Sequence, residues 1–247
     1  MVRKTAAEAE ETRQRIIDAA VEVFAAQGVP YSTLDQIARM AGVTRGAVYW
    51  HFNGKLEVLQ AVLSSRQHPL ELEFTAEAGI ELSWEAVVTA MLDAVHGPKS
   101  KQFSEILIYQ GVDESGLIHG RMVQASNRFL HYIHQVLRHA VAQGELPSTL
   151  DLHTSIAIFK GLITGLLYEG LRSPEQPPQV INVAMRSFLA LLKDPPRHLL
   201  CEEVQVSQDH YNERKPSSTR EGSFRPDLQM DTSHSTAFEA PLECRGS

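Results

Sequence analysis

Cysteine and tryptophan are both scarce in this sequence. Its 247 residues include only two of each. Cys201 and Cys244 lie late in the chain, and neither has a second cysteine or a histidine at a metal-binding spacing. Such isolated cysteines argue against a disulfide framework and against a zinc site. We therefore expect two free thiols and no bound metal.

Long apolar runs are also missing. No stretch approaches the roughly 18 consecutive apolar residues that a membrane-spanning helix needs. The first residues, Met1 to Glu11, are polar and charged, unlike a secretory signal. These two features predict a cytoplasmic protein without a membrane partner.

Short motifs typical of enzymes are absent as well. The sequence contains no G-x-S-x-G element, no phosphate-binding loop and no dinucleotide fingerprint. His131, His134 and His139 recur along one predicted helix, but they lack the glutamate and the four-residue histidine spacing of a zinc peptidase. We interpret these histidines as surface or pocket-lining residues, and we expect no catalytic residue and no cofactor.

The charge balance permits DNA as a partner. A formal net charge of −7 would by itself argue against nucleic-acid binding. The first 66 residues, however, contain eight basic and seven acidic side chains, so the excess acidity lies elsewhere. A small DNA-binding domain needs only a few cations that face the phosphate groups of the duplex.

The spacing of apolar residues predicts an all-α fold. Apolar positions recur every three or four residues, and no segment alternates with the two-residue period of a half-buried strand. The predicted helices cover about 5–27, 33–41, 44–52, 56–63, 83–95, 103–111, 117–142, 151–171 and 178–193. We expect a three-helix helix-turn-helix DNA-binding domain over 1–66 and a helical ligand-binding and dimerisation bundle over 67–196. The polar segment 197–247 has no apolar period beyond Gln205 and is predicted to be a disordered tail.

Two short helices joined by a glycine turn indicate a helix-turn-helix. Ile37, Ala38 and Val43 are predicted to face the first helix, and Gly42 permits a left-handed turn. The segment that follows Thr44 forms only about two helical turns, so it presents few side chains.

That short helix carries groups suited to DNA. Arg45 can donate to a guanine edge through both arms of its guanidinium, and Gly46 lets the backbone approach the groove. The predicted donors to phosphate oxygens are Thr33, Thr44, Tyr49, Trp50, His51 and Lys55. Arg3 and Lys4 precede the first helix and are suited to form an arm toward the duplex. The alternative is that the aromatic residues are core residues of a helix pair that never contacts DNA.

The segment from Thr33 to Lys55, TLDQIARMAGVTRGAVYWHFNGK, resembles the signature of the TetR family of repressors. It is most similar to the branch that controls multidrug and solvent efflux-pump operons. The resemblance implies a homodimer that binds a palindromic operator in double-stranded DNA and releases it when a small hydrophobic effector binds. It also implies that the DNA-facing positions are Thr33, Thr44, Arg45, Gly46, Tyr49, Trp50, His51 and Lys55.

The central helices are rich in apolar and aromatic residues and poor in polar ones. This composition favours an apolar or aromatic effector, oriented by few hydrogen bonds. Most of these side chains are expected to be ordinary core. The candidates for a ligand pocket are Trp84, Met91, Phe103, Ile106, Tyr109, Gln110, Met122, Phe129, Ile133, His134, Phe159, Ile163 and Leu166.

The last two predicted helices carry apolar faces that we expect one bundle cannot cover completely. These faces are formed by Ile156, Phe159, Leu162, Ile163, Leu166 and Leu167, and by Val180, Ile181, Ala184, Phe188, Leu191 and Leu192. Gly161 and Gly165 allow close approach, which favours a four-helix interface between two copies. An interaction protein that pairs with another regulator and relieves repression is the alternative function.

Overall fold

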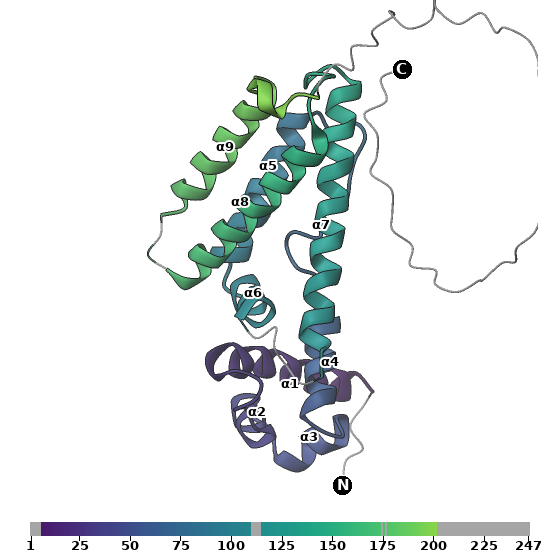
Figure 1. Cartoon of the computed structure of the whole chain (residues 1–247). Coiled ribbons are helices and arrows are strands. Elements are labelled where there is room, and N and C mark those ends of the chain that lie inside the picture. Colours follow the sequence, from purple (N-terminus) through teal and green to yellow (C-terminus); the bar gives the residue numbers. More distant parts are fainter. Residues whose placement is uncertain (1–5, 110–114, 174, 176, 202–247) are drawn as a thin grey trace, which may run out of the picture. The chain divides into compact units, whose positions relative to one another are not determined.

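The computed structural model describes residues 6–109, 115–173, 175 and 177–201. These residues form α1 (Ala6–Gln27), α2 (Leu34–Met40), α3 (Arg45–His51), α4 (Lys55–Ser65), α5 (Ile80–His96), α6 (Ser100–Tyr109), α7 (Leu117–Ala142), α8 (Leu152–Arg172) and α9 (Gln179–Lys193) (Figure 1). Extended pairing within the described ranges is limited to an isolated antiparallel bridge between Leu150 and Leu200. The predicted all-α fold is confirmed.

Local hydrogen bonds explain where the short helices begin and end. Thr33 caps α2 with a reciprocal capping box, because its hydroxyl accepts from the backbone N–H of Gln36 while the Gln36 side chain accepts from the backbone N–H of Thr33. Thr44 caps α3 by accepting a backbone N–H three residues further on. Gly42 adopts φ +66°, the left-handed conformation predicted for the turn.

One core cluster holds the first four helices together. Its buried members include Ile16 and Phe24 of α1, Ile37 of α2, Val48 of α3 and Leu59 of α4. Four further members come from α6 and α7, namely Phe103, Ile106, Leu107 and Ile118. The N-terminal helices therefore share their core with helices beyond residue 66, and the domain boundary predicted there stays a prediction.

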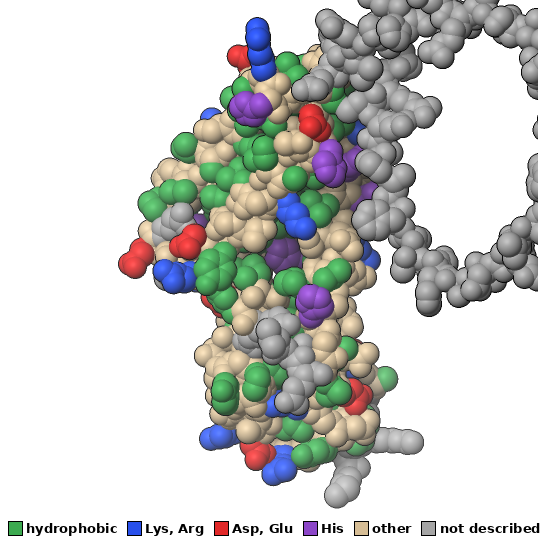
Figure 2. Space-filling model, in the orientation of Figure 1, with side chains coloured by type: hydrophobic (Ala, Val, Ile, Leu, Met, Phe, Trp, Pro, Cys, Tyr) green, Lys and Arg blue, Asp and Glu red, His purple; other side chains and the backbone are tan. Residues whose placement is uncertain are grey.

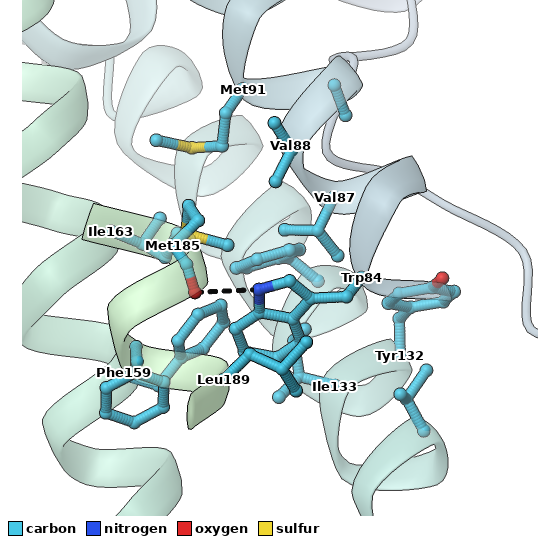
Figure 3. Close-up of a cluster of buried hydrophobic side chains, with 14 of the residues drawn as sticks. Trp84, Val87, Val88, Met91, Tyr132, Ile133, Phe159, Ile163, Met185 and Leu189 are labelled. Carbon is cyan, nitrogen blue, oxygen red and sulfur yellow. Dashed lines mark hydrogen bonds between the residues drawn. The ribbon is translucent and has the colours of Figure 1, made fainter. Parts of the chain in front are cut away.

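A second core cluster lies among α5, α7, α8 and α9 (Figure 3). Trp84 stands near its centre, with its ring centroid 5.1 Å from that of Phe159 and 6.2 Å from that of Phe188. Its indole N–H donates to the carbonyl of Met185 at 2.9 Å. The one polar atom of this large ring is thus satisfied inside the protein, and the buried indole joins α5 to α9.

The apolar faces of α8 and α9 are covered mainly by their own chain. The residues that the structure buries here are Phe159, Ile163, Leu167, Ile181, Phe188 and Leu192. Other members of the predicted faces, Ile156, Leu162, Leu166, Ala184 and Leu191, are only half-buried. The single chain therefore does not cover these faces completely, and the interface between two copies stays a prediction. Other large apolar residues of these two helices are exposed, namely Ile158, Tyr168, Val180 and Val183.

The described chain continues briefly past α9. A 3₁₀ turn covers Arg197–Leu199, Leu199 is buried, and its carbonyl accepts from the N–H of Asp151 at 2.8 Å. Residues 202–247 of the predicted tail lie outside the described residues. No helix among those described is long and apolar enough to cross a membrane.

Candidate nucleic-acid interface

The turn between α2 and α3 has the geometry of a helix-turn-helix. The N–H of Val43 donates to the carbonyl of Ala38 at 3.0 Å, and the N–H of Gly42 donates to Arg39 at 3.2 Å. These bonds close the end of α2 through a left-handed glycine. Ile37 and Ala38 are buried and Val43 packs partly buried against the same core, as predicted.

The short helix α3 buries one side and exposes the other. Val48 and Phe52 belong to the core. Tyr49 is 46% exposed and Trp50 is 73% exposed, so the interpretation of these two rings as core aromatics is wrong. The predicted DNA-facing residues that the structure exposes are Thr33, Thr44, Arg45, Gly46, Tyr49 and Trp50, while His51 and Lys55 are half-buried. Folding of the described chain does not require the exposed groups of α3, which leaves them available for a partner.

Lys55 has a structural role that no local sequence pattern predicts. Its ammonium group donates to the carbonyls of Val29, Pro30 and Ser32, at 2.7, 3.0 and 3.0 Å. The start of α4 is thereby tied to the loop between α1 and α2. Because these acceptors lie 23 to 26 residues earlier in the chain, only the tertiary structure brings them to Lys55. Its contact with phosphate stays a prediction.

Arg45 is oriented by two neighbours. Its Nη1 lies 3.3 Å from Oδ2 of Asp35 in α2, and its Nη2 lies 3.3 Å from the hydroxyl oxygen of Tyr49 in α3. The bond with Tyr49, followed by the charge of Asp35, raises the pKa of Arg45, so this exposed group is a permanent cation. Figure 2 shows basic and acidic side chains next to one another at this end of the protein.

The predicted pocket residues do not form a single group. The core among α5, α7, α8 and α9 contains Trp84, Met91, Phe129, Ile133, Phe159 and Ile163, and Leu166 packs against it partly buried. Phe103 and Ile106 belong instead to the core shared with the N-terminal helices. Tyr109 is exposed, Met122 and His134 are half-buried, and Gln110 lies outside the described residues, as do Arg3 and Lys4.

Two hollows beside α7 are lined by other residues. One of about 540 Å³ lies between the end of α4 and the start of α7, and one of about 550 Å³ lies between Leu72 and Tyr132. Gln67 and Arg128 line both. Most of the residues that line them are polar, unlike those of the apolar pocket predicted from the sequence.

The comparisons with known proteins identify the family. Residues 16–62 match the model of bacterial regulatory proteins, tetR family. The chain is 80% identical over 208 residues to the HTH-type transcriptional regulator SrpR of Pseudomonas putida, covering 84% of this chain and 98% of that protein. The chain belongs to the TetR family. A further TetR-family relative is AcrR of Shigella flexneri, 32% identical over 83% of this chain and 97% of that protein.

A solved structure supports the same assignment. MexZ of Pseudomonas aeruginosa, described as a key repressor responsible for antibiotic resistance, matches with a TM-score of 0.64 and 26% identity. The match covers 77% of this chain and 98% of that one. The predicted placement within the efflux-regulator branch of the TetR family is confirmed. As a member of this family, the chain is a DNA-binding transcriptional regulator and not an enzyme. Among its described residues, no group of three or more His, Cys, Asp and Glu is arranged to hold a metal ion.

An arginine connects the N-terminal helices of this TetR-family regulator to α7. Arg121 of α7 donates to the carbonyls of Leu63 and Arg66, at 3.2 and 3.0 Å, and thereby satisfies acceptors at the end of α4. It also forms a bidentate pair with Glu71, and the two side chains are only 11% and 2% exposed. Arg128 donates to the same carboxylate at 3.1 Å. These contacts of Arg121 with Leu63, Arg66 and Glu71 form a joint between α7 and the end of α4. The sequence did not predict this joint, because its partners lie 50 to 58 residues apart in the chain.

Glu71 is ionised in this joint. Burial by itself would raise the pKa of its carboxyl, but the hydrogen bonds from Arg121 and from the backbone of His68, together with the two arginine charges, lower it overall. The ion pair connects α7 to the segment that follows α4, while the bonds from Arg121 to the carbonyls of Leu63 and Arg66 connect α7 to the end of α4 itself.

Proposed function

We propose that the protein is a cytoplasmic, homodimeric repressor of a multidrug or solvent efflux operon. The observation that carries the proposal is the set of exposed side chains around Arg45 on α3, in a chain that belongs to the TetR family. Relatives with similar sequences or folds are described as repressors of multidrug efflux pumps, among them SmeT of Stenotrophomonas maltophilia. We assign DNA binding to 1–66 and effector binding to 67–196.

In this proposal α3 enters the major groove of a palindromic operator. Arg45 donates to a guanine edge, and Gly46 allows the backbone close to the bases. Tyr49, which contacts Arg45, and the exposed Trp50 donate to phosphate oxygens and set the register of the helix on the duplex. Thr33 and Thr44, His51 and Lys55 complete the proposed set of contacts.

The homodimer would form through the exposed sides of α8 and α9. Figure 2 shows hydrophobic side chains at the surface over these helices. The exposed apolar and small residues are Ile158, Gly161, Gly165, Tyr168, Val180, Val183 and Ala190. No heavy atom lies within 4 Å of the position of a Cβ at Gly161 or Gly165, so a partner helix could approach closely. Two copies related by a two-fold axis would present their α3 helices about 34–36 Å apart, one turn of DNA.

A small hydrophobic effector would enter the apolar core around Trp84. Because Trp84, Met91 and Phe159 are packed and buried, a ligand must separate them to find room. An effector that binds the opened form more tightly than the closed form shifts the population toward the opened form. The affinity for the operator can then fall only as far as the difference between these two effector affinities allows.

A gel-shift titration tests the proposal, with the full chain and DNA from upstream of its own gene. We expect tight, salt-sensitive binding by the wild-type protein, and loss of about 1–3 kcal/mol of specific binding for Arg45→Ala. Arg138→Ala removes another exposed arginine, from α7, and serves as the control with unchanged binding. Absence of wild-type binding at low salt would instead support pairing with another regulator.

A further inference from the structure

We propose that Asp35 is a specificity-determining residue that acts through Arg45. The inference rests on the proposed function, since it requires Arg45 to read a base. Asp35 lies in the first turn of α2, and its carboxylate holds Nη1 of Arg45 on the exposed side of α3.

Two tethers on different helices fix the guanidinium. Asp35 binds Nη1 from α2, and Tyr49 binds Nη2 from the next turn of α3, with the guanidinium carbon 5.4 Å from the centre of the tyrosine ring. An arginine has five N–H donors, so these two bonds leave donors on both arms for a guanine edge. Holding the long side chain before DNA arrives reduces the conformational freedom lost on binding.

Folding does not account for this contact. The side chains of Arg45 and Asp35 are 62% and 53% exposed, and ion pairs at such sites contribute little to stability. The α2 cap is provided by Thr33 and Gln36 without the Asp35 side chain. Replacement of Asp35 should therefore leave the fold intact.

The charge of Asp35 has a second consequence. A carboxylate beside the reading helix repels the phosphates of any duplex, whatever its sequence. The benefit of an oriented Arg45 appears only where a guanine stands in the right place. Asp35 thus lowers affinity for non-specific DNA while it raises the preference for the operator.

The test compares the dissociation constants of the full chain for an operator duplex and for a scrambled duplex of equal length, by fluorescence anisotropy at several salt concentrations. For Asp35→Ala we expect tighter binding to the scrambled duplex and a preference ratio reduced by about three- to tenfold, part of the discrimination of an arginine–guanine pair. Asp35→Asn removes the same charge but keeps an acceptor oxygen, so its ratio should fall less.

Glu10→Ala is the matched control. Glu10 also pairs with an arginine, the half-buried Arg13, but both residues lie in α1. Its loss should leave the ratio unchanged. An Asp35→Ala ratio within twofold of wild type, with Arg45→Ala still losing the operator, overturns the inference and leaves the proposed function standing. A wild-type ratio of one overturns both.

Discussion

Protonation of the buried His68 should weaken the fold as the pH falls. Its Nε2 lies 3.0 Å from the hydroxyl of Ser104, and its Nδ1 accepts from the N–H of Leu70 at 3.3 Å. Because the Ser104 hydroxyl gives its hydrogen to the carbonyl of Ser100, the ring must donate through Nε2 and accept through Nδ1. A proton added at Nδ1 would face the N–H of Leu70, so the neutral ring is the form that fits.

The magnitude follows from the pKa of His68. Burial lowers it from the ordinary value of 6.5 to about 4, and the charge of Arg121 acts in the same direction against the opposing charges of Glu71 and Asp93. The unfolded chain therefore takes up the proton first. Stability from neutral His68 is fully present above pH 6.5 and is lost as the pH falls toward 4, a change of roughly 3 kcal/mol.

Urea unfolding measures this effect when wild type and His68→Gln are compared at one protein concentration from pH 7 to pH 4. The glutamine amide can still donate to Ser104, but it does not titrate. We expect the unfolding free energy of the wild type to fall by roughly 3 kcal/mol relative to that of His68→Gln as the pH decreases across this range. Groups that titrate in both proteins and do not interact with His68, such as Asp151, cancel in the difference. A difference that stays constant with pH would refute the assignment of a neutral buried ring.

Two further predictions concern the joint and the turn. Glu71→Gln should cost about 3–5 kcal/mol of unfolding free energy in a urea titration, because it leaves the charge of Arg121 buried without its partner. Arg128→Gln, at a side chain 54% exposed, should cost less than about 1 kcal/mol, and equal losses would contradict this account. Gly42→Ala should cost about 1–2 kcal/mol from its left-handed backbone alone, since nothing lies within 4 Å of an added Cβ. Gly46→Ala, inside α3, should instead stabilise the protein by about 0.5–1 kcal/mol. Thermal unfolding measures both variants, and a change in stability of the same sign for the two would contradict this prediction.

The sequence by itself determined the local structure of the helix-turn-helix formed by α2 and α3. The caps at Thr33 and Thr44 and the turn at Gly42 depend on partners within a few residues, so local spacing is enough to predict them. The resemblance carried by the segment from Thr33 to Lys55 then indicated the family. Exposure of Tyr49 and Trp50 was not determined in this way, because the sequence also allowed them to be core residues and only the packing of α3 decided between the two.

Only the tertiary structure decided which surfaces meet. Apolar periodicity marks the buried side of a helix but not its partner, so Phe103, predicted to line a pocket, packs with the N-terminal helices instead. The same limit left open how much of the apolar faces of α8 and α9 their own chain covers. The bonds of Lys55, Arg121 and Asp35 to distant elements are likewise invisible in local patterns, because long side chains find acceptors only once the helices are packed.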